Sequence, residues 1–167
     1  MMELKTERLR LIPLNAVNLK LLIDNQKAME LKLSLSHSDE ILSEELRQAM
    51  EYRLTKVVND KQNYLWNTNW LIVSDDNNCV IGGMMLKGLP NANGEVIIGY
   101  YTLPNYQGNG YMTETIIRTK SWLLSQPNVR YIIADTEKDN NASHRVLEKT
   151  GAEMYKETEE LYYWRIF

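Results

Sequence analysis

Two glycines stand in the segment at residues 104–114 (PNYQGNGYMTE), between a predicted strand and a predicted helix. Glycine lets the backbone turn sharply and approach a ligand without interference from a Cβ atom. The first N–H groups of a helix, together with the positive end of its dipole, attract phosphate. Gly108 and Gly110 therefore indicate a site for an anionic cofactor, and a plain strand-to-helix turn is the alternative interpretation of so short a motif.

Two common nucleotide motifs do not fit this segment. A P-loop needs a lysine directly after its last glycine, and Tyr111 follows Gly110 instead. A dinucleotide-binding fingerprint needs a third small residue where Thr113 stands. The anionic cofactor is therefore not expected to be bound in either of these two ways.

The elements around the glycines form a strand, a helix and a second strand. Residues 95–102 (EVIIGYYT) are typical of a strand, and residues 109–125 carry apolar side chains at helical spacing. A strand follows at residues 129–135, and then a helix that ends at Gly151, a residue suited to the position after a helix. Such a unit can form a right-handed crossover with parallel strands.

The rest of the chain supplies strands and helices in mixed order. We expect a strand at residues 9–12, a helix from Asn15 to about Asn25, and no clear pattern over residues 27–37. Ser38 is predicted to cap a long helix whose apolar side chains are Leu42, Leu46, Met50, Leu54 and Val57. The remaining strands are expected at residues 70–73, 80–86, 152–156 and 161–167. The order β-α-α-β-β-β-α-β-α-β-β predicts an α+β fold with a mixed central sheet flanked by helices.

Composition narrows the function classes. A chain of 167 residues with 44% hydrophobic residues and no repeats or linker predicts one domain, residues 1–167. The formal net charge of −3 gives no general reason to bind nucleic acid. The apolar runs are too short to span a membrane, and residues 1–8 do not resemble a signal peptide. A single cysteine, Cys79, fits the reducing cytoplasm.

The glycine segment resembles the pyrophosphate signature of the GNAT superfamily of acyl-CoA-dependent N-acyltransferases, Gln/Arg-x-x-Gly-x-Gly/Ala. Gln107 and Gly110 match it, and Met112 departs from it. Within the superfamily the chain resembles the RimJ/RimL branch, which contains ribosomal-protein N-terminal acetyltransferases. Four segments carry that resemblance in order: TERLRLIPL at residues 6–14, IGY at 98–100, GNGYMTE at 108–114 and NNASHRVLEKTGA at 140–152.

The resemblance implies a GNAT fold and acetyl-CoA as co-substrate, with no metal. In this family the strand before the glycine loop parts from its parallel neighbour and pairs with the pantetheine arm of the cofactor. Asn140 would reach the pantetheine or the thioester, and an N-cap role is the alternative or additional role for this residue. The full set of implied cofactor-binding residues is Tyr101, Thr102, Leu103, Gln107, Gly108, Asn109, Gly110, Tyr111, Met112, Thr113 and Asn140.

The implied reaction is direct attack of an amine on the thioester, which needs a base and benefits from an acid. Glu95 and Asp135 are the candidate bases. Each could instead be an ordinary exposed carboxylate at a strand end, and a chain of water molecules could take the place of either residue as the base. Ser143 is the candidate acid, and tyrosines of the last strands could act as the acid in its place. Ser143 could also be no more than a polar residue in the first turn of a helix.

Other side chains that attract notice have plainer interpretations. His37 and His144 lack metal-ligand spacing and are expected to be structural. Glu157, Glu159 and Glu160 fit a solvated turn. The aromatic residues of the last segment fit either the core or an acceptor groove, and they are Tyr162, Tyr163, Trp164 and Phe167.

The resemblance leaves the acceptor open. A peptide or protein N-terminal α-amine follows from the RimJ/RimL likeness, and a small amine such as a polyamine, an amino sugar or an antibiotic is the alternative. An acyl-CoA-binding module without catalysis is a further possibility, and the chain is expected to be a monomer or a homodimer. Residues 27–37 are expected to help choose the acceptor.

Overall fold

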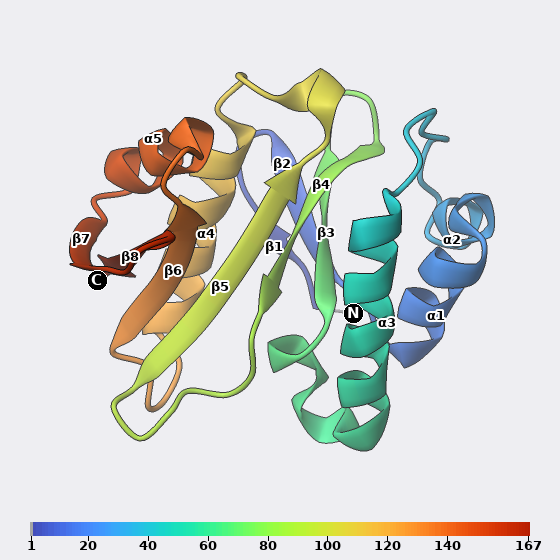
Figure 1. The fold of residues 1–167 in the computed structure, drawn as a ribbon. Coiled ribbons are helices and arrows are strands. Elements are labelled where there is room, and N and C mark those ends of the chain that lie inside the picture. The colour runs from blue at the N-terminus through green and yellow to red at the C-terminus, as the bar shows by residue number, and fades with distance from the viewer. Residues whose placement is uncertain (1) are drawn as a thin grey trace.

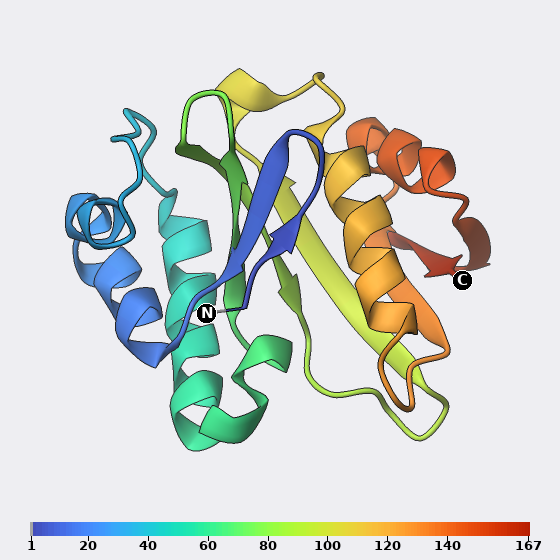
Figure 2. The same ribbon diagram turned by 180° about the vertical axis from the view of Figure 1, so that it is seen from behind.

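One eight-stranded sheet, in the order β1-β2-β3-β4-β5-β6-β8-β7, carries helices on both faces (Figures 1 and 2). The computed structural model describes residues 2–167, so Met1, the first residue of the expected domain, lies outside it. The strands are β1 (Leu4–Lys5), β2 (Leu9–Pro13), β3 (Asn69–Ser74), β4 (Cys79–Leu86), β5 (Glu95–Thr102), β6 (Tyr131–Glu137), β7 (Glu153–Glu157) and β8 (Leu161–Ile166). The helices are α1 (Ala16–Asp24), α2 (Gln26–Lys32), α3 (Glu44–Asn59), α4 (Tyr111–Leu124) and α5 (Asn141–Lys149), with 3₁₀ turns η1 (Lys61–Trp66) and η2 (Pro104–Tyr106).

The sheet is mixed, which confirms the expected fold class. β5 and β6 are parallel neighbours connected through α4, and the other strand pairs described are antiparallel. The hairpin formed by β3 and β4 and the last hairpin, β7 and β8, both lie where the sequence predicts them. β6 starts at Tyr131, two residues later than predicted.

β5 divides its length between two neighbours. Its first three residues, Glu95 to Ile97, pair with Tyr131 to Ile133 of β6. From Ile98 onward the strand pairs with β4 alone among the strands described, while β6 continues to pair with β8 on its other edge. A slot therefore opens between β5 and β6 beyond Ile97.

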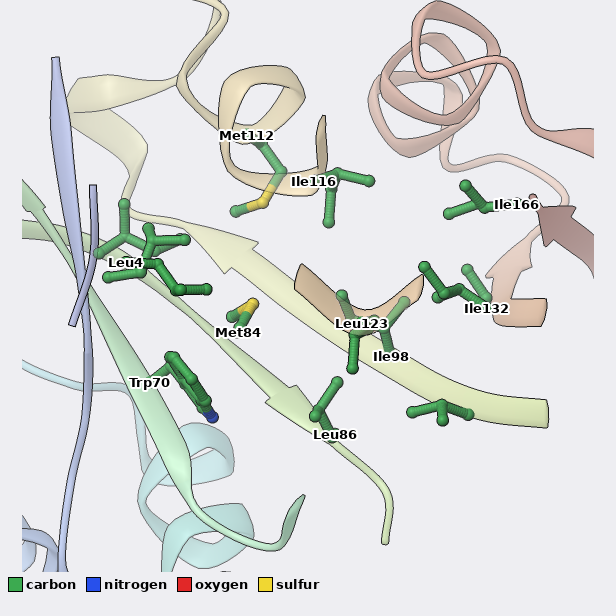
Figure 3. Close-up of a cluster of buried hydrophobic side chains, with 14 of the residues drawn as sticks. Leu4, Trp70, Met84, Leu86, Ile98, Met112, Ile116, Leu123, Ile132 and Ile166 are labelled. Carbon is green, nitrogen blue, oxygen red and sulfur yellow. The ribbon is translucent and has the colours of Figure 1, made fainter. Parts of the chain in front are cut away.

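The core lies on both sides of the sheet because successive strand residues point to opposite faces. In β3, Trp70 packs on the α4 face, in the cluster that Figure 3 shows with Met84 and Ile116, while Leu71 packs under α1, α2 and α3. This double burial explains why β3, with the sequence NWLIVS, is buried at every residue. Residues of β5 and β6 thus belong either to the α4 face or to the α1–α3 face.

The prediction that Ser38 caps the long helix is wrong. Ser43 is the N-cap of α3, and its hydroxyl accepts a hydrogen bond from the Leu46 N–H at 3.2 Å. Ser38 is buried in the preceding segment, where its own N–H donates to the carboxylate of Glu30. That buried carboxylate and its partners hold the chain in an irregular path, so the helix starts later.

The region without a clear pattern contains a short helix. α2 begins after Asn25, whose side chain accepts a hydrogen bond from the Ala28 N–H at 3.0 Å. Only Met29 and Glu30 of this helix are buried, so its apolar periodicity is too weak to be recognised. β1, with two residues, is likewise too short to give a signal.

Candidate active site

A cleft of about 510 Å³ lies beside the slot, a size typical of small-molecule sites. Its walls come from the end of β5, the glycine loop, the start of α4 and the start and outer turns of α5. Aspartate and glutamate are absent from the lining, although the chain as a whole is acidic. The lining residues are Tyr100, Tyr101, Thr102, Tyr106, Gln107, Gly108, Asn109, Gly110, Tyr111, Met112, Thr113, Asn140, Ala142, Ser143, Arg145, Val146 and Lys149.

The glycine loop presents a row of free backbone donors. Gly108 and Gly110 both have φ of 78°, a left-handed conformation that residues with a Cβ rarely adopt. Within residues 2–167, the six N–H groups of residues 108–113 have no hydrogen-bond acceptor, and Gly110 caps α4 without a side chain. Six donors at a helix N-terminus suit a pyrophosphate, which supplies several anionic oxygens.

Arg8 holds the glycine loop to the start of α4. Its guanidinium donates to the carbonyl oxygen of Asn109 at 3.1 Å, lies 4.6 Å from the centre of the Tyr111 ring and pairs with Glu114 at 2.7 Å. Glu114 also accepts hydrogen bonds from the Thr6 hydroxyl and the Arg8 N–H. Burial acts to raise the pKa of Glu114, but these hydrogen bonds outweigh it and hold that pKa below its ordinary value.

α5 supplies the second wall. Asn140 is its N-cap, and the side-chain oxygen accepts a hydrogen bond from the Ser143 N–H at 3.2 Å, so the expected capping role is present. Asn140 and Ser143 both line the cleft. Arg145 and Lys149 lie one turn apart on the same wall, and neither pairs with a carboxylate of residues 2–167. The cleft is therefore electropositive.

Backbone alternation identifies which groups of β5 face the slot. The N–H of Leu103 donates to Ile81 at 2.9 Å and the carbonyl of Ile97 accepts from Lys87 at 2.8 Å, so both residues bond toward the β4 side. Tyr101 lies an even number of positions from both residues, so it also bonds toward β4. Tyr100 and Thr102 alternate with these residues, so their backbone N–H and C=O groups point away from β4, toward the slot.

This alternation changes the expected pairing with an extended ligand. Tyr100 and Thr102 offer their backbone groups to the slot, whereas those of Tyr101 and Leu103 are directed at β4. Leu103 also lines a separate small cavity on the α1–α3 side rather than the cleft. The side-chain amide of Gln107 donates to the carbonyl of Thr102 at 3.1 Å, so Gln107 fastens the loop to the end of the strand.

Tyr100 is a site residue that the sequence reasoning missed. Its hydroxyl is buried and has no hydrogen-bond partner of normal geometry among residues 2–167. Burial raises the pKa of Tyr100 to about 12, against a smaller opposing effect of the neighbouring Ser143 hydroxyl. A protonated hydroxyl without a partner, in the wall of a cleft, is positioned to bond a ligand. Strand alternation after Ile98 was the available signal, because it places this tyrosine on the α4 face.

Met112 does not block the cleft with its side chain. The residue is 6% exposed and packs in the core below α4, with Ile116 (Figure 3). Its backbone N–H remains one of the six free donors. The large side chain at this position of the signature is thus accommodated by the core.

The two candidate bases lie at different ends of the slot. Glu95 is outside the cleft, at the closed end of the β5–β6 pair, where it meets Arg165 at 3.7 Å and Asn91 at 2.9 Å. Tyr100, the nearest cleft-lining residue of β5, follows Glu95 by five positions, roughly 17 Å along the strand. Asp135 lies two residues past the last β5–β6 pair, at the point where the slot begins, which is called its mouth below. Its side chain is 35% exposed, and its carboxylate lies 3.7 Å from the Lys87 Nζ.

Asp135 and the cleft lie on opposite faces of the sheet. Ile132 and Ala134 of β6 belong to the α4-side core, so Asp135 points to the α1–α3 face. In Figure 1 that face is toward the viewer, and α3 lies beside β5 and β6 rather than over them. Ile97, on the same face, is 39% exposed, as an open surface requires. The slot therefore connects the cleft with a second, open face.

The remaining residues of interest have structural partners. His37 contacts the buried Glu30 at 3.0 Å, and His144 contacts the Glu137 carbonyl at 3.0 Å and packs against Trp164. Trp164 is buried, whereas Phe167 is 49% exposed. Glu157, Glu159 and Glu160 are exposed, but only Glu159 and Glu160 lie in the turn, since Glu157 ends β7 and pairs with Lys138 at 3.0 Å. Within residues 2–167 no group of three histidine, cysteine or acidic side chains lies close enough to hold a metal ion.

Known protein families show to which family this chain belongs. The family described as acetyltransferase (GNAT) domain matches residues 8–153, most of the chain. The chain belongs to the GNAT acetyltransferase family. The recognition made from the glycine segment and its companions is thereby confirmed.

One relative by sequence and two solved structures are similar to this chain. The uncharacterized N-acetyltransferase YjdG of Bacillus subtilis (strain 168) is 34% identical over 96 residues, which make up 58% of this chain and 57% of YjdG. The ribosomal-protein-S5-alanine acetyltransferase of Vibrio fischeri shares the fold with a TM-score of 0.71, at 16% identity over 99% of this chain and 96% of that one.

A second similar structure, RimL, is described as a ribosomal L7/L12 alpha-N-protein acetyltransferase in complex with coenzyme A. It has a TM-score of 0.71 at 14% identity, over 98% of this chain and 97% of that one. At such identities the likeness establishes the shared fold. Within residues 2–167 no helix combines the length and the apolar character that a bilayer crossing needs.

Proposed function

We propose that this GNAT chain transfers an acetyl group from acetyl-CoA to a primary amine in a ternary complex. The observation that carries the proposal is the parting of β5 from β6 beside six unpaired N–H groups. One end of this arrangement suits a pyrophosphate and the other suits an extended chain that adds to a strand edge.

The residues present fit the pyrophosphate, the pantetheine arm and a further phosphate of coenzyme A. The N–H groups of residues 108–113 would hold the pyrophosphate, and the slot-facing backbone of Thr102 and Tyr100 would pair with the pantetheine. The side-chain N–H₂ of Asn140 remains free to donate toward the pantetheine, because only its oxygen is used by the cap. Arg145 and Lys149 would neutralise the remaining phosphate charge.

Proton transfer would take place on both sides of the slot. Asp135, at the mouth, would take the proton that the attacking amine must lose, directly or through a water. Ser143 or Tyr100, in the cleft wall, would give a proton to the departing thiolate. Glu95 receives no support as the base from its position at the closed end.

We infer that the acceptor is the N-terminal α-amine of a peptide or protein. The open α1–α3 face beside Asp135 leaves room for a chain to approach, and two structural neighbours are named as acetyltransferases of ribosomal proteins. We also propose a cytoplasmic location, since Cys79 is a free thiol of the kind found in reducing compartments.

The test is the release of free CoA thiol from acetyl-CoA with three acceptors: a short peptide with a free N-terminus, a polyamine and an amino sugar. The control peptide has the same sequence with a blocked N-terminus. We expect turnover with the free peptide and none with the blocked one. Turnover confined to the small amines would contradict the peptide acceptor, and binding without turnover on any amine would indicate a module without catalysis.

A further inference from the structure

Lys87 places an amine of the protein itself at the mouth of the slot. Its Nζ lies 3.7 Å from the Asp135 carboxylate, with 42% of the lysine side chain exposed. The residue follows directly after β4, and its N–H donates to the Ile97 carbonyl at 2.8 Å. Ile97 is the last residue of β5 paired with β6, so the backbone of Lys87 is fixed where the slot begins.

The side chain of Lys87 extends beside Gly99 of β5. A Cβ built on Gly99 would lie 2.9 Å from the Sδ of Met85 and 3.8 Å from the Cε of Lys87, so Met85 fills the space next to the glycine and the lysine stem lies within contact distance of it. The ammonium group thereby reaches Asp135 on the far strand of the slot. Lys87 thus bridges β4 and β6 across the opening.

The direction of the proposed cofactor leads to the same point. From the glycine loop the slot-facing backbone runs through Thr102 to Tyr100, and Gly99 follows. A pantetheine arm that follows these groups carries its thioester toward Gly99, where Lys87 and Asp135 meet. Lys87 has the position of an acceptor amine, beside the carboxylate proposed as the base.

We propose that Lys87 is a site of self-acetylation. This inference rests on the proposed function. Asp135 takes a proton from Nζ, the neutral nitrogen attacks the thioester carbonyl carbon, and the C–S bond breaks. The attacking nitrogen, cationic after bond formation, loses its second proton to water, and the thiolate receives a proton from the cleft wall or from water. The products are Nε-acetyl-Lys87, free CoA and one released proton. Acetylation removes the lysine charge and with it the ion pair to Asp135.

The modification would change the affinity of the open face for a cationic acceptor. With Lys87 charged, an incoming ammonium group competes with it for the Asp135 carboxylate. Once Lys87 is acetylated, that carboxylate is free of its partner and a neutral amide replaces the ammonium group beside it. Acetylated protein is therefore expected to have a lower KM for a cationic acceptor than unmodified protein.

The experiment incubates the purified full chain with acetyl-CoA and no acceptor, and follows acetylation of each lysine by peptide mass mapping. Lys138 and Lys149 serve as internal references for spontaneous chemistry, and the Lys87→Arg variant keeps the positive charge without an acetylatable amine. We expect Lys87 to be modified at least about tenfold faster than the references. Asp135→Asn should slow that modification about a hundredfold while calorimetry shows unchanged acetyl-CoA binding.

The outcomes separate this inference from the proposed function. Acetyl-CoA binding and turnover on a peptide, with Lys87 modified no faster than Lys138, would overturn self-acetylation alone. Equal modification in the native and the urea-unfolded chain would do the same. Absence of acetyl-CoA binding would overturn both proposals.

Discussion

Asp135 and Glu95 are carboxylates on neighbouring parallel strands, yet only Asp135 lies where the strands part. We expect Asp135→Asn to lower kcat by about 10² to 10⁴, because a general base contributes that much. Glu95→Gln is the matched control, and it should change kcat by less than about twofold, since Glu95 contacts Arg165 and Asn91 far from the cleft. Steady-state kinetics with a saturating amine measures both. An equal loss in the two variants would contradict the assignment.

Tyr100 and Ser143 are the two hydroxyls that can protonate the leaving thiolate. Tyr100→Phe removes a buried hydroxyl that lacks a partner, so stability should stay the same or rise while kcat falls about tenfold to a hundredfold. Ser143→Ala is measured in parallel, with kcat, the KM for acetyl-CoA and the unfolding midpoint as readouts. Unchanged turnover in one variant at saturating amine removes that residue from the mechanism.

Single residues of the site were predictable to different degrees. Gly108, Gly110, Asn140 and Ser143 come together in one cleft because their motif fixes backbone conformation over a short stretch. The sequence predicts Leu103 among the cofactor-binding residues, because residue types alone do not show which residues of a strand direct their backbone groups toward the slot. The contribution of Arg8 depends on a contact across more than 100 residues of sequence, and local patterns carry no signal for it.

The start of α4 is held to the connection between β1 and β2 through Glu114, which accepts hydrogen bonds from Thr6 and Arg8. We expect Glu114→Gln to lower the free energy of unfolding at pH 7 by about 1–2 kcal/mol. Folding lowers the pKa of this carboxyl, so its contribution is complete above the ordinary value of 4.5 and is lost as pH falls through the lower, folded-state value. Urea unfolding at pH 7, 5 and 4 measures the difference between wild type and variant. A difference that grows toward low pH would contradict the assigned direction.

Gly83 in β4 gives room to the side chain of Tyr101. A Cβ at this position would lie 2.6 Å from the Tyr101 hydroxyl and ring, so an added methyl group must displace the tyrosine. We expect Gly83→Ala to destabilise the fold by about 1–3 kcal/mol through overpacking and to raise the KM for acetyl-CoA, because Tyr101 also lines the cleft. Gly88→Ala is a comparison for the kinetic readout only: no atom lies within 4 Å of its Cβ position, but its φ of 102° makes the alanine strained, so it should lower stability and leave the KM for acetyl-CoA unchanged. Thermal unfolding and steady-state kinetics are the measurements.

Elements with long apolar periodicity were predictable, and capped or irregular ones were not. α3 was recognised from Met50, Val57 and their neighbours, but its start moved from Ser38 to Ser43. The cause is a buried tertiary contact: Glu30 accepts a hydrogen bond from the Ser38 N–H and holds the preceding segment away from helical geometry. A capping preference is local and does not include such a competitor.

In the whole molecule, the sheet separates the side from which the cofactor would bind from the side from which the amine would bind. α4 and α5 cover the face with the electropositive cleft, while the other face is open at β5 and β6 (Figures 1 and 2). A slot in the same sheet connects the two faces. In our proposal this geometry brings a large cofactor from one side and an amine from the other, so the two substrates do not compete for space.

The most direct test of the cofactor site is titration calorimetry with acetyl-CoA, free CoA and ATP on protein stripped of bound ligand. We expect acetyl-CoA and CoA to bind in the micromolar range, about −8 kcal/mol, and ATP to bind far more weakly because it lacks the pantetheine arm that pairs with the slot. Absence of detectable CoA binding, or equal binding of ATP, would contradict the claim that the six free N–H groups and the parted strands form an acetyl-CoA site.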